Sequence, residues 1–106
     1  MAWIHLIVAG LLEIFWAICL KYTDGFSKLW PSVLTIAGMI ASFYFLAQAL
    51  KTIPVGTGYA IWTGIGAAGT AILGIAVLGD SAAPVRILCI GLILVGVVGL
   101  RLVSDG

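Results

Sequence analysis

Glu13 is the acidic residue of this sequence that lies deep inside an apolar stretch. The surrounding segment, residues 9–17, contains no other ionisable side chain. A charged side chain at the centre of a membrane-spanning helix costs about 2.5 to 3.5 kcal/mol on insertion scales, and such residues usually mark pathways for ions or protons. We therefore interpret Glu13 as a binding residue. The alternative is a neutral carboxyl that packs two helices together through a hydrogen bond.

A single carboxylate can bind a cation or a proton, but not both at once, because each neutralises the same charge. A cation that binds Glu13 therefore drives a proton off. If the site opens alternately to the two sides of a membrane, this competition exchanges protons for the cation. The hypothesis is that Glu13 binds both substrate and proton in an antiporter.

Two neighbours of Glu13 are expected on the same helix face. Trp16 follows it by three positions and Gly10 precedes it by three, and residues at this spacing are neighbours on a helix surface. The indole N–H of Trp16 can only donate a hydrogen bond, which suits a carboxylate acceptor. Gly10 allows another helix to approach closely.

Three further side chains are predicted to line the site or to orient Glu13. They are Ser42, in the middle of another apolar segment, and Tyr59 and Trp62, three apart in a third. Aromatic faces attract cations, and a carboxylate accepts two parallel hydrogen bonds from a planar guanidinium group. The set therefore favours a guanidinium-type small cation. Two alternatives stay open, an interfacial anchor for Tyr59 and a bond from Ser42 to its own backbone.

The composition of the chain indicates that Glu13 lies within a membrane protein. Of its 106 residues, 63% are hydrophobic and 8% are charged, whereas about a quarter are charged in a typical soluble domain. Four apolar segments are each near the length that crosses a bilayer. The composition predicts an all-α integral membrane protein in a lipid bilayer, a single domain over residues 1–106. The expected spans are approximately 2–20, 29–50, 55–78 and 85–103.

Glycines are concentrated in the third and fourth spans, and seven of the 14 fall between Gly56 and Gly79. Glycine in a membrane helix permits a bend or close helix packing. We predict such a role for Gly64 and Gly66. In the fourth span we predict packing between two copies of the chain at three glycines, Gly91, Gly96 and Gly99.

The charges of the loops are almost balanced across the membrane. Four spans place Lys51 and Arg101 on one side, with the N-terminal amine, and Lys21, Lys28 and Arg86 on the other. The positive-inside rule needs a clear excess to fix orientation, so the chain is a candidate for insertion both ways. Inversely oriented repeats give transporters their two access states, and two oppositely inserted copies would supply the same symmetry. We therefore expect an antiparallel, dual-topology homodimer; the alternative is one orientation fixed by other features.

Other classes of function find no support in the sequence. Cys19 and Cys89 lie in apolar runs without partners at metal-ligand spacing, and the net charge of +1 does not suggest a nucleic-acid partner. The chain shows no nucleophile–base arrangement and no phosphate-binding loop. We expect a protein that is not an enzyme and that uses no cofactor or metal.

Nearly the whole chain resembles the small multidrug resistance transporters. The resemblance rests on the lone Glu13 in the first span, on Gly25-Phe-Ser-Lys-Leu-Trp-Pro-Ser32 and on Tyr59-Ala-Ile-Trp-Thr-Gly-Ile-Gly66. It implies an antiparallel homodimer in the bacterial inner membrane that exchanges protons for cations through paired glutamates.

Within that family, the chain resembles the guanidinium exporter branch, which carries Trp three residues after the glutamate, as Trp16 follows Glu13 here, and Trp-Thr-Gly in the third span. The resemblance implies a site made of the same five residues, Glu13, Trp16, Ser42, Tyr59 and Trp62. It also implies export of some alkylated guanidinium or quaternary ammonium compounds. The chain departs from the drug exporters in its fourth span, where they have two glycines seven apart; seven residues after Gly91 stands Val98.

Two alternative functions remain at this point. One is a broader multidrug exporter of bulky quaternary ammonium ions, against which the large side chain of Trp16 argues by narrowing the site. The other is a small structural or regulatory subunit of a membrane complex, in which Glu13 would pair with a basic residue of a partner.

Overall fold

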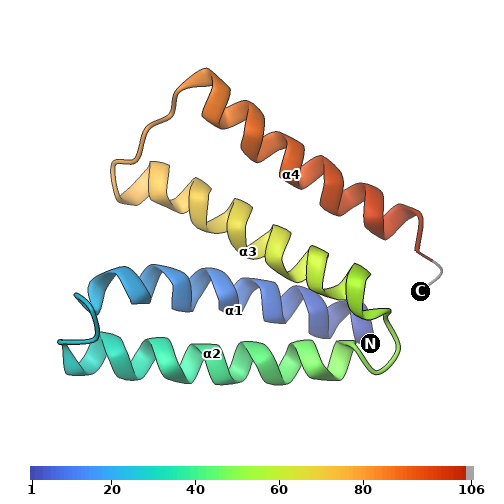
Figure 1. Cartoon of the computed structure of the whole chain (residues 1–106), viewed down its shortest axis with the longest axis horizontal. Coiled ribbons are helices and arrows are strands. Elements are labelled where there is room, and N and C mark those ends of the chain that lie inside the picture. The colour runs from blue at the N-terminus through green and yellow to red at the C-terminus, as the bar shows by residue number, and fades with distance from the viewer. Residues whose placement is uncertain (105–106) are drawn as a thin grey trace.

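Four helices joined by short loops make up the computed structural model, which describes residues 1–104 (Figure 1). All four are long and apolar enough to cross a membrane. This confirms an all-α, multi-pass membrane protein with four transmembrane helices. The helix ends differ from the expected spans by at most two residues. The helices are α1 (Ala2–Tyr22), α2 (Leu29–Ala49), α3 (Val55–Val77) and α4 (Pro84–Leu102).

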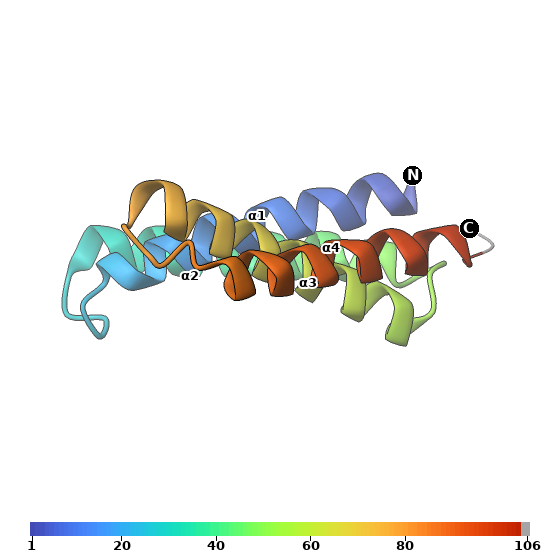
Figure 2. The ribbon, with the colours of Figure 1, turned by 90° about the horizontal axis from the view of Figure 1, so that it is seen from above.

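Helix α1 packs between α2 and α3, and α4 lies on the far side of α3 (Figure 1). The start of α1, the loop between α2 and α3 and the end of α4 lie at one end of the bundle, and the other two loops lie at the opposite end. Seen from above, the helices form a thin slab (Figure 2). The extents of the chain are 42 × 34 × 17 Å. One helix with its side chains is about 10–12 Å across, so a single chain offers little depth in which to enclose a solute.

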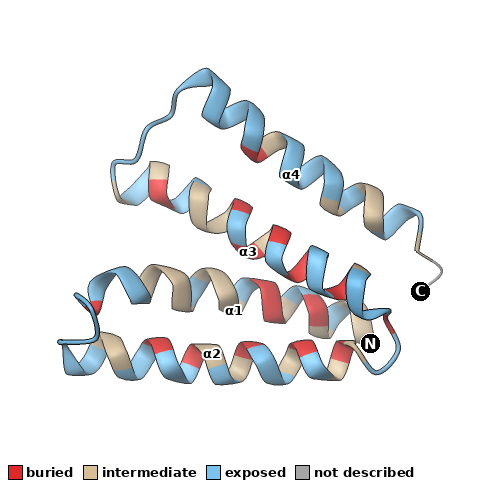
Figure 3. Ribbon diagram, in the orientation of Figure 1, coloured by how far each residue is buried: buried red, intermediate tan, exposed pale blue. Residues whose placement is uncertain are grey.

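The core is small and lies where α1, α2 and α3 meet (Figure 3). Helix α4 contributes little to it, since Ile90 is its one buried residue. Apart from the side that packs on α3, the α4 surface is therefore open to lipid or to another chain. The core residues are Leu6, Ala9, Leu46, Ala49, Ile53, Ile61 and Trp62.

Glycines lie at two of the helix crossings. A Cβ atom at Gly10 would lie 2.7 Å from Cγ2 of Ile65, and one at Gly64 would lie 2.5 Å from Cγ2 of Val97. Both distances are too short for a side chain, so glycine is what allows α1 to approach α3 and α3 to approach α4 so closely. Helix α3 is continuous through this region, and a bend at Gly64 or Gly66 stays a prediction.

The turn after α3 depends on a left-handed glycine. Gly79 has φ of +74°, and the backbone N–H of Asp80 donates to the carbonyl of Gly74 over 3.0 Å. Glycine adopts this conformation without the steric penalty that a side chain would bring. The turn therefore directs Asp80 back along α3.

Candidate cation-binding site

Glu13 lies near the middle of α1, and its carboxylate rests against Gly66 of α3. A Cβ atom at Gly66 would overlap that carboxylate, so this position admits only glycine while Glu13 keeps its place. The side chain of Glu13 is partly buried, and its Oε1 atom is buried without a hydrogen-bond partner among residues 1–104. Buried polar atoms are nearly always satisfied, so an unpaired carboxylate oxygen in a membrane helix marks a place where a ligand can bind.

The carboxylate faces a hollow of about 350 Å³ between α1, α3 and the loop that follows α3. Small side chains of both helices make room for it, among them Ala17, Ala67 and Ala71. Its remaining lining is polar. Besides Glu13, the polar residues that line the hollow are Thr63, Thr70, Asp80 and Arg86.

A second polar cluster joins α1, α2 and α3 through Ser42. The Ser42 hydroxyl donates to the carbonyl oxygen of Ala9 over 2.7 Å, and the indole N–H of Trp62 donates to the Ser42 oxygen over 3.0 Å. Ser42 and Trp62 are both buried, whereas Tyr59 is exposed and places its ring 5.4 Å from that of Trp62 in an edge-to-face arrangement. The structure thus brings together three of the five predicted site residues.

These three residues do not hydrogen-bond to Glu13 within the chain. The single hydroxyl proton of Ser42 is used by Ala9 and the indole proton of Trp62 is used by Ser42, so neither group has a donor left for the carboxylate. Ala9 stands four residues before Glu13, which makes its carbonyl the usual helical partner of the Glu13 backbone N–H. The cluster therefore holds the helical turn that carries Glu13, rather than its side chain.

Trp16 lies on the α2 side of α1. A Cβ atom at Gly38 of α2 would lie 2.9 Å from Cβ of Trp16, and Trp16 does not line the hollow around Glu13. Its indole nitrogen is buried and finds no acceptor in the described part of the chain. One turn of α1 thus carries an unpaired acceptor and an unpaired donor.

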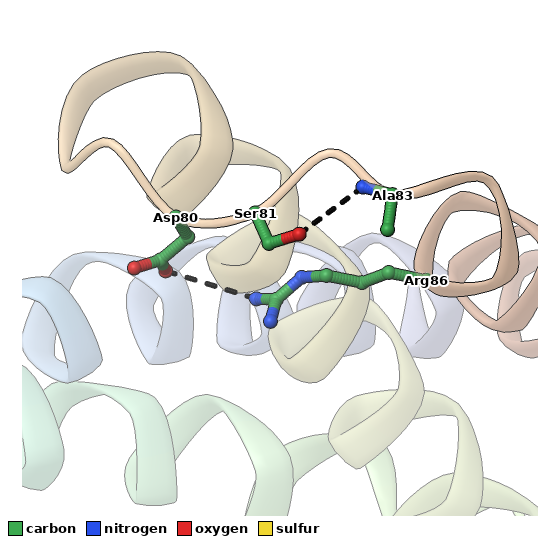
Figure 4. A network of polar contacts seen from close by, with 4 residues as sticks. All are labelled: Asp80, Ser81, Ala83 and Arg86. Atoms are coloured by element: carbon green, nitrogen blue, oxygen red, sulfur yellow. Dashed lines mark hydrogen bonds and ion pairs between the residues drawn. The ribbon is translucent and has the colours of Figure 1, made fainter.

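Our reading of the sequence missed Thr70, Asp80 and Arg86 as parts of the site. Thr70 had a detectable signal, because Thr63, Gly66 and Thr70 have the spacing of one helix face. Asp80 and Arg86 had no such signal in the sequence, because their positions depend on the turn at Gly79. Their side chains form an ion pair with 3.7 Å between Oδ2 of Asp80 and Nη2 of Arg86 (Figure 4).

The other predicted positions are open in this structure. Among residues 1–104, nothing lies within 4 Å of a Cβ atom built at Gly91, Gly96 or Gly99, so their role in contacts between copies stays a prediction. Over residues 1–104, no group of three or more His, Cys, Asp or Glu side chains could hold a metal ion.

Four transmembrane helices around an unpaired intramembrane carboxylate define a multi-pass membrane protein with a candidate site for cations. A family model described as "Small Multidrug Resistance protein" matches residues 1–93. The chain belongs to this family, as its sequence motifs predicted.

Named relatives match nearly the full length of the chain. A protein of Yersinia pseudotuberculosis named "Guanidinium exporter" is 62% identical over 104 residues, which are 98% of this chain and 100% of the relative. A protein of Citrobacter freundii with the same name is 60% identical over 102 residues, which are 96% of this chain and 97% of the relative. These bacterial relatives agree with the predicted location in the bacterial inner membrane.

We expect Ser42→Ala to destabilise the fold by about 1 to 2 kcal/mol, because it leaves the buried indole N–H of Trp62 without an acceptor. Denaturant titration in detergent micelles, followed by tryptophan fluorescence, measures the change. Ser32→Ala on the same helix is the matched control, since the Ser32 hydroxyl bonds only the preceding turn at the Lys28 carbonyl. Equal stability of the two variants would show that the cluster does not hold the three helices together.

Proposed function

We propose that this protein is a proton-coupled antiporter that exports guanidinium, together with small substituted guanidinyl or quaternary ammonium cations. The observation that carries the proposal is the buried, unpaired Oε1 atom of Glu13, a residue that also lines a hollow near the middle of the membrane span. The printed names of the relatives support the choice of substrate.

The lining of the hollow suits a small planar cation. Guanidinium carries N–H donors along its edges, and the carboxylate of Glu13 can accept two of them in parallel. The hydroxyls of Thr63 and Thr70 supply further acceptors in the same hollow. Glycine and alanine beside them leave room for the ligand, and the charged donor of the lining, that of Arg86, pairs with Asp80.

Proton coupling follows from the use of one carboxylate for two ligands. A protonated Glu13 is neutral and attracts a cation weakly, whereas a bound guanidinium neutralises the carboxylate and excludes the proton. Only the two neutralised forms remove the cost of an unpaired charge in the membrane. A strict exchanger must be able to turn its site from one side of the membrane to the other in these two forms, with a proton bound or with the cation bound.

Two copies of the chain, inserted in opposite directions, form the proposed working unit. A slab 17 Å thick leaves the hollow open on one side, and a second copy can close it. The buried donor of Trp16 and the buried acceptor of Glu13 both lack partners within residues 1–104. The exposed face of α4, with Gly91, Gly96 and Gly99, offers a surface on which a second helix can pack.

An inward proton gradient should drive guanidinium uphill in proteoliposomes, and Glu13→Gln should abolish this transport, because the amide can neither release a proton nor carry a charge. The measurement is the export of labelled guanidinium from preloaded vesicles, against its concentration gradient. Asp24→Asn is the matched control, since it removes a carboxylate that lies in an exposed loop and should transport as the wild type does. Transport that survives Glu13→Gln would disprove the mechanism.

Guanidinium binding, followed by tryptophan fluorescence, should weaken as the pH falls, because protons then occupy Glu13 and the cation must displace them. Glu13→Gln should show neither binding nor this pH dependence. If the wild type gave no response to guanidinium at any pH, a structural or regulatory membrane subunit would explain the protein better. An equal response to bulky aromatic cations would favour the broader quaternary ammonium exporter.

Co-reconstitution of wild-type and Glu13→Gln chains tests the dimer. If both glutamates are needed, activity should fall with the square of the wild-type fraction, so that an equal mixture keeps about a quarter of the activity when copies pair at random. Mixtures of wild type with Asp24→Asn should keep full activity. A linear decline with the wild-type fraction would mean that each chain works alone.

A further inference from the structure

The hollow around Glu13 contains a second carboxylate at its mouth, that of Asp80. Its position is built into the fold: Gly79 adopts the left-handed conformation, and the Asp80 N–H donates to the Gly74 carbonyl over 3.0 Å. A Cβ atom at Gly74 would overlap the Asp80 carboxylate, just as one at Gly66 would overlap that of Glu13. Each carboxylate of the hollow thus rests on a glycine of α3.

The acceptors of the hollow are arranged along α3 from its mouth to the middle of the membrane. Gly66, Thr70 and Gly74 follow at four-residue intervals, which correspond to about 6 Å each along a helix axis. Thr70 lines the hollow between the two glycines, and its buried Oγ1 atom has no hydrogen-bond partner within residues 1–104. A cation that moves from Asp80 to Glu13 therefore has an acceptor about halfway, over a total of about 12 Å.

The guanidinium of Arg86 pairs with Asp80 only loosely (Figure 4). The 3.7 Å between Nη2 and Oδ2 exceeds hydrogen-bond length, and the two side chains are 42% and 48% exposed. Ion pairs with this exposure contribute little to stability. The carboxylate thus keeps acceptor sites for a second cation, and the group that stands beside it is itself a guanidinium.

We propose that Asp80 forms an outer binding site for guanidinium-type cations at the mouth of the Glu13 hollow. This proposal rests on the proposed substrate of Glu13. Arg86 occupies the outer site when no substrate is present. An arriving guanidinium takes its place at Asp80, because both cations present the same planar donors to the same carboxylate. The cation then passes Thr70 to reach Glu13.

Asp80→Asn should raise the KM for guanidinium transport by about two- to fivefold, the range that fits one exposed ion pair. The maximal rate at saturating guanidinium should change by less than about twofold, because Glu13 still performs the exchange. Asp24→Asn is the matched control: Asp24 lies in the loop at the same end of the bundle but not in the hollow, so its KM should equal that of the wild type. An unchanged KM in Asp80→Asn would overturn the outer site.

The double variant Asp80→Asn/Arg86→Gln separates binding from simple repulsion. Asp80→Asn alone leaves the charge of Arg86 unpaired at the mouth, where it repels cations. If repulsion were the whole effect, the double variant would restore the wild-type KM and the outer site would be refuted. If Asp80 binds the cation, the KM stays raised.

Arg86→Lys tests the outer site independently, in case the Asp80→Asn variant does not insert into the membrane. The variant keeps the positive charge but removes the planar donors, so the side chain at position 86 competes less well with guanidinium for Asp80. The KM for guanidinium should therefore fall below that of the wild type. An equal or higher KM would contradict the proposal. These outcomes are distinct from failure of the proposed function, in which the wild type itself would not transport guanidinium.

Discussion

The structure depends on keeping one carboxylate unpaired inside an apolar bundle. Glu13 stands in the middle of α1, and its Oε1 atom is buried without a partner among residues 1–104. Gly66 provides the space for the carboxylate, since any side chain there would displace it. An unsatisfied buried acceptor destabilises a fold by about 1 to 3 kcal/mol. This cost is what the proposed role of Glu13 explains, since a bound cation or proton would satisfy the carboxylate.

The polar cluster beside Glu13 shows the opposite arrangement. The hydroxyl of Ser42 and the indole of Trp62 are fully used, toward Ala9 and toward each other. Satisfied buried polar groups rigidify their surroundings, and this cluster holds the backbone one turn before Glu13. The turn is thereby fixed while the carboxylate stays free. In the proposed mechanism, a fixed backbone turn would keep Glu13 in one place on α1 while its carboxylate binds either the proton or the cation.

The sequence predicted the helices well and the contacts between them only in part. The length of each apolar run predicted the four spans, an acidic residue inside the first run pointed to Glu13, and the concentration of glycines in the third pointed to Gly64. Spacing from Glu13 pointed to Gly10. Spacing on one helix does not reveal how two helices are rotated against each other. It therefore could not show that Ser42 bonds Ala9, or that Trp16 lies against Gly38. The place of Asp80 depends on the φ angle of Gly79, which no periodic pattern encodes.

The shortness of the chain links the site to the proposed assembly. Four helices in a slab 17 Å thick bury a small core and leave α4 almost wholly exposed. Such a chain can hold a carboxylate at mid-membrane but cannot surround what binds to it. A second copy would close the hollow. If that copy were inserted in the opposite direction, the pair would have the inverted symmetry that gives transporters their two access states. The nearly equal loop charges, which favour neither orientation, fit the proposed pair, in which one copy is inserted in each orientation.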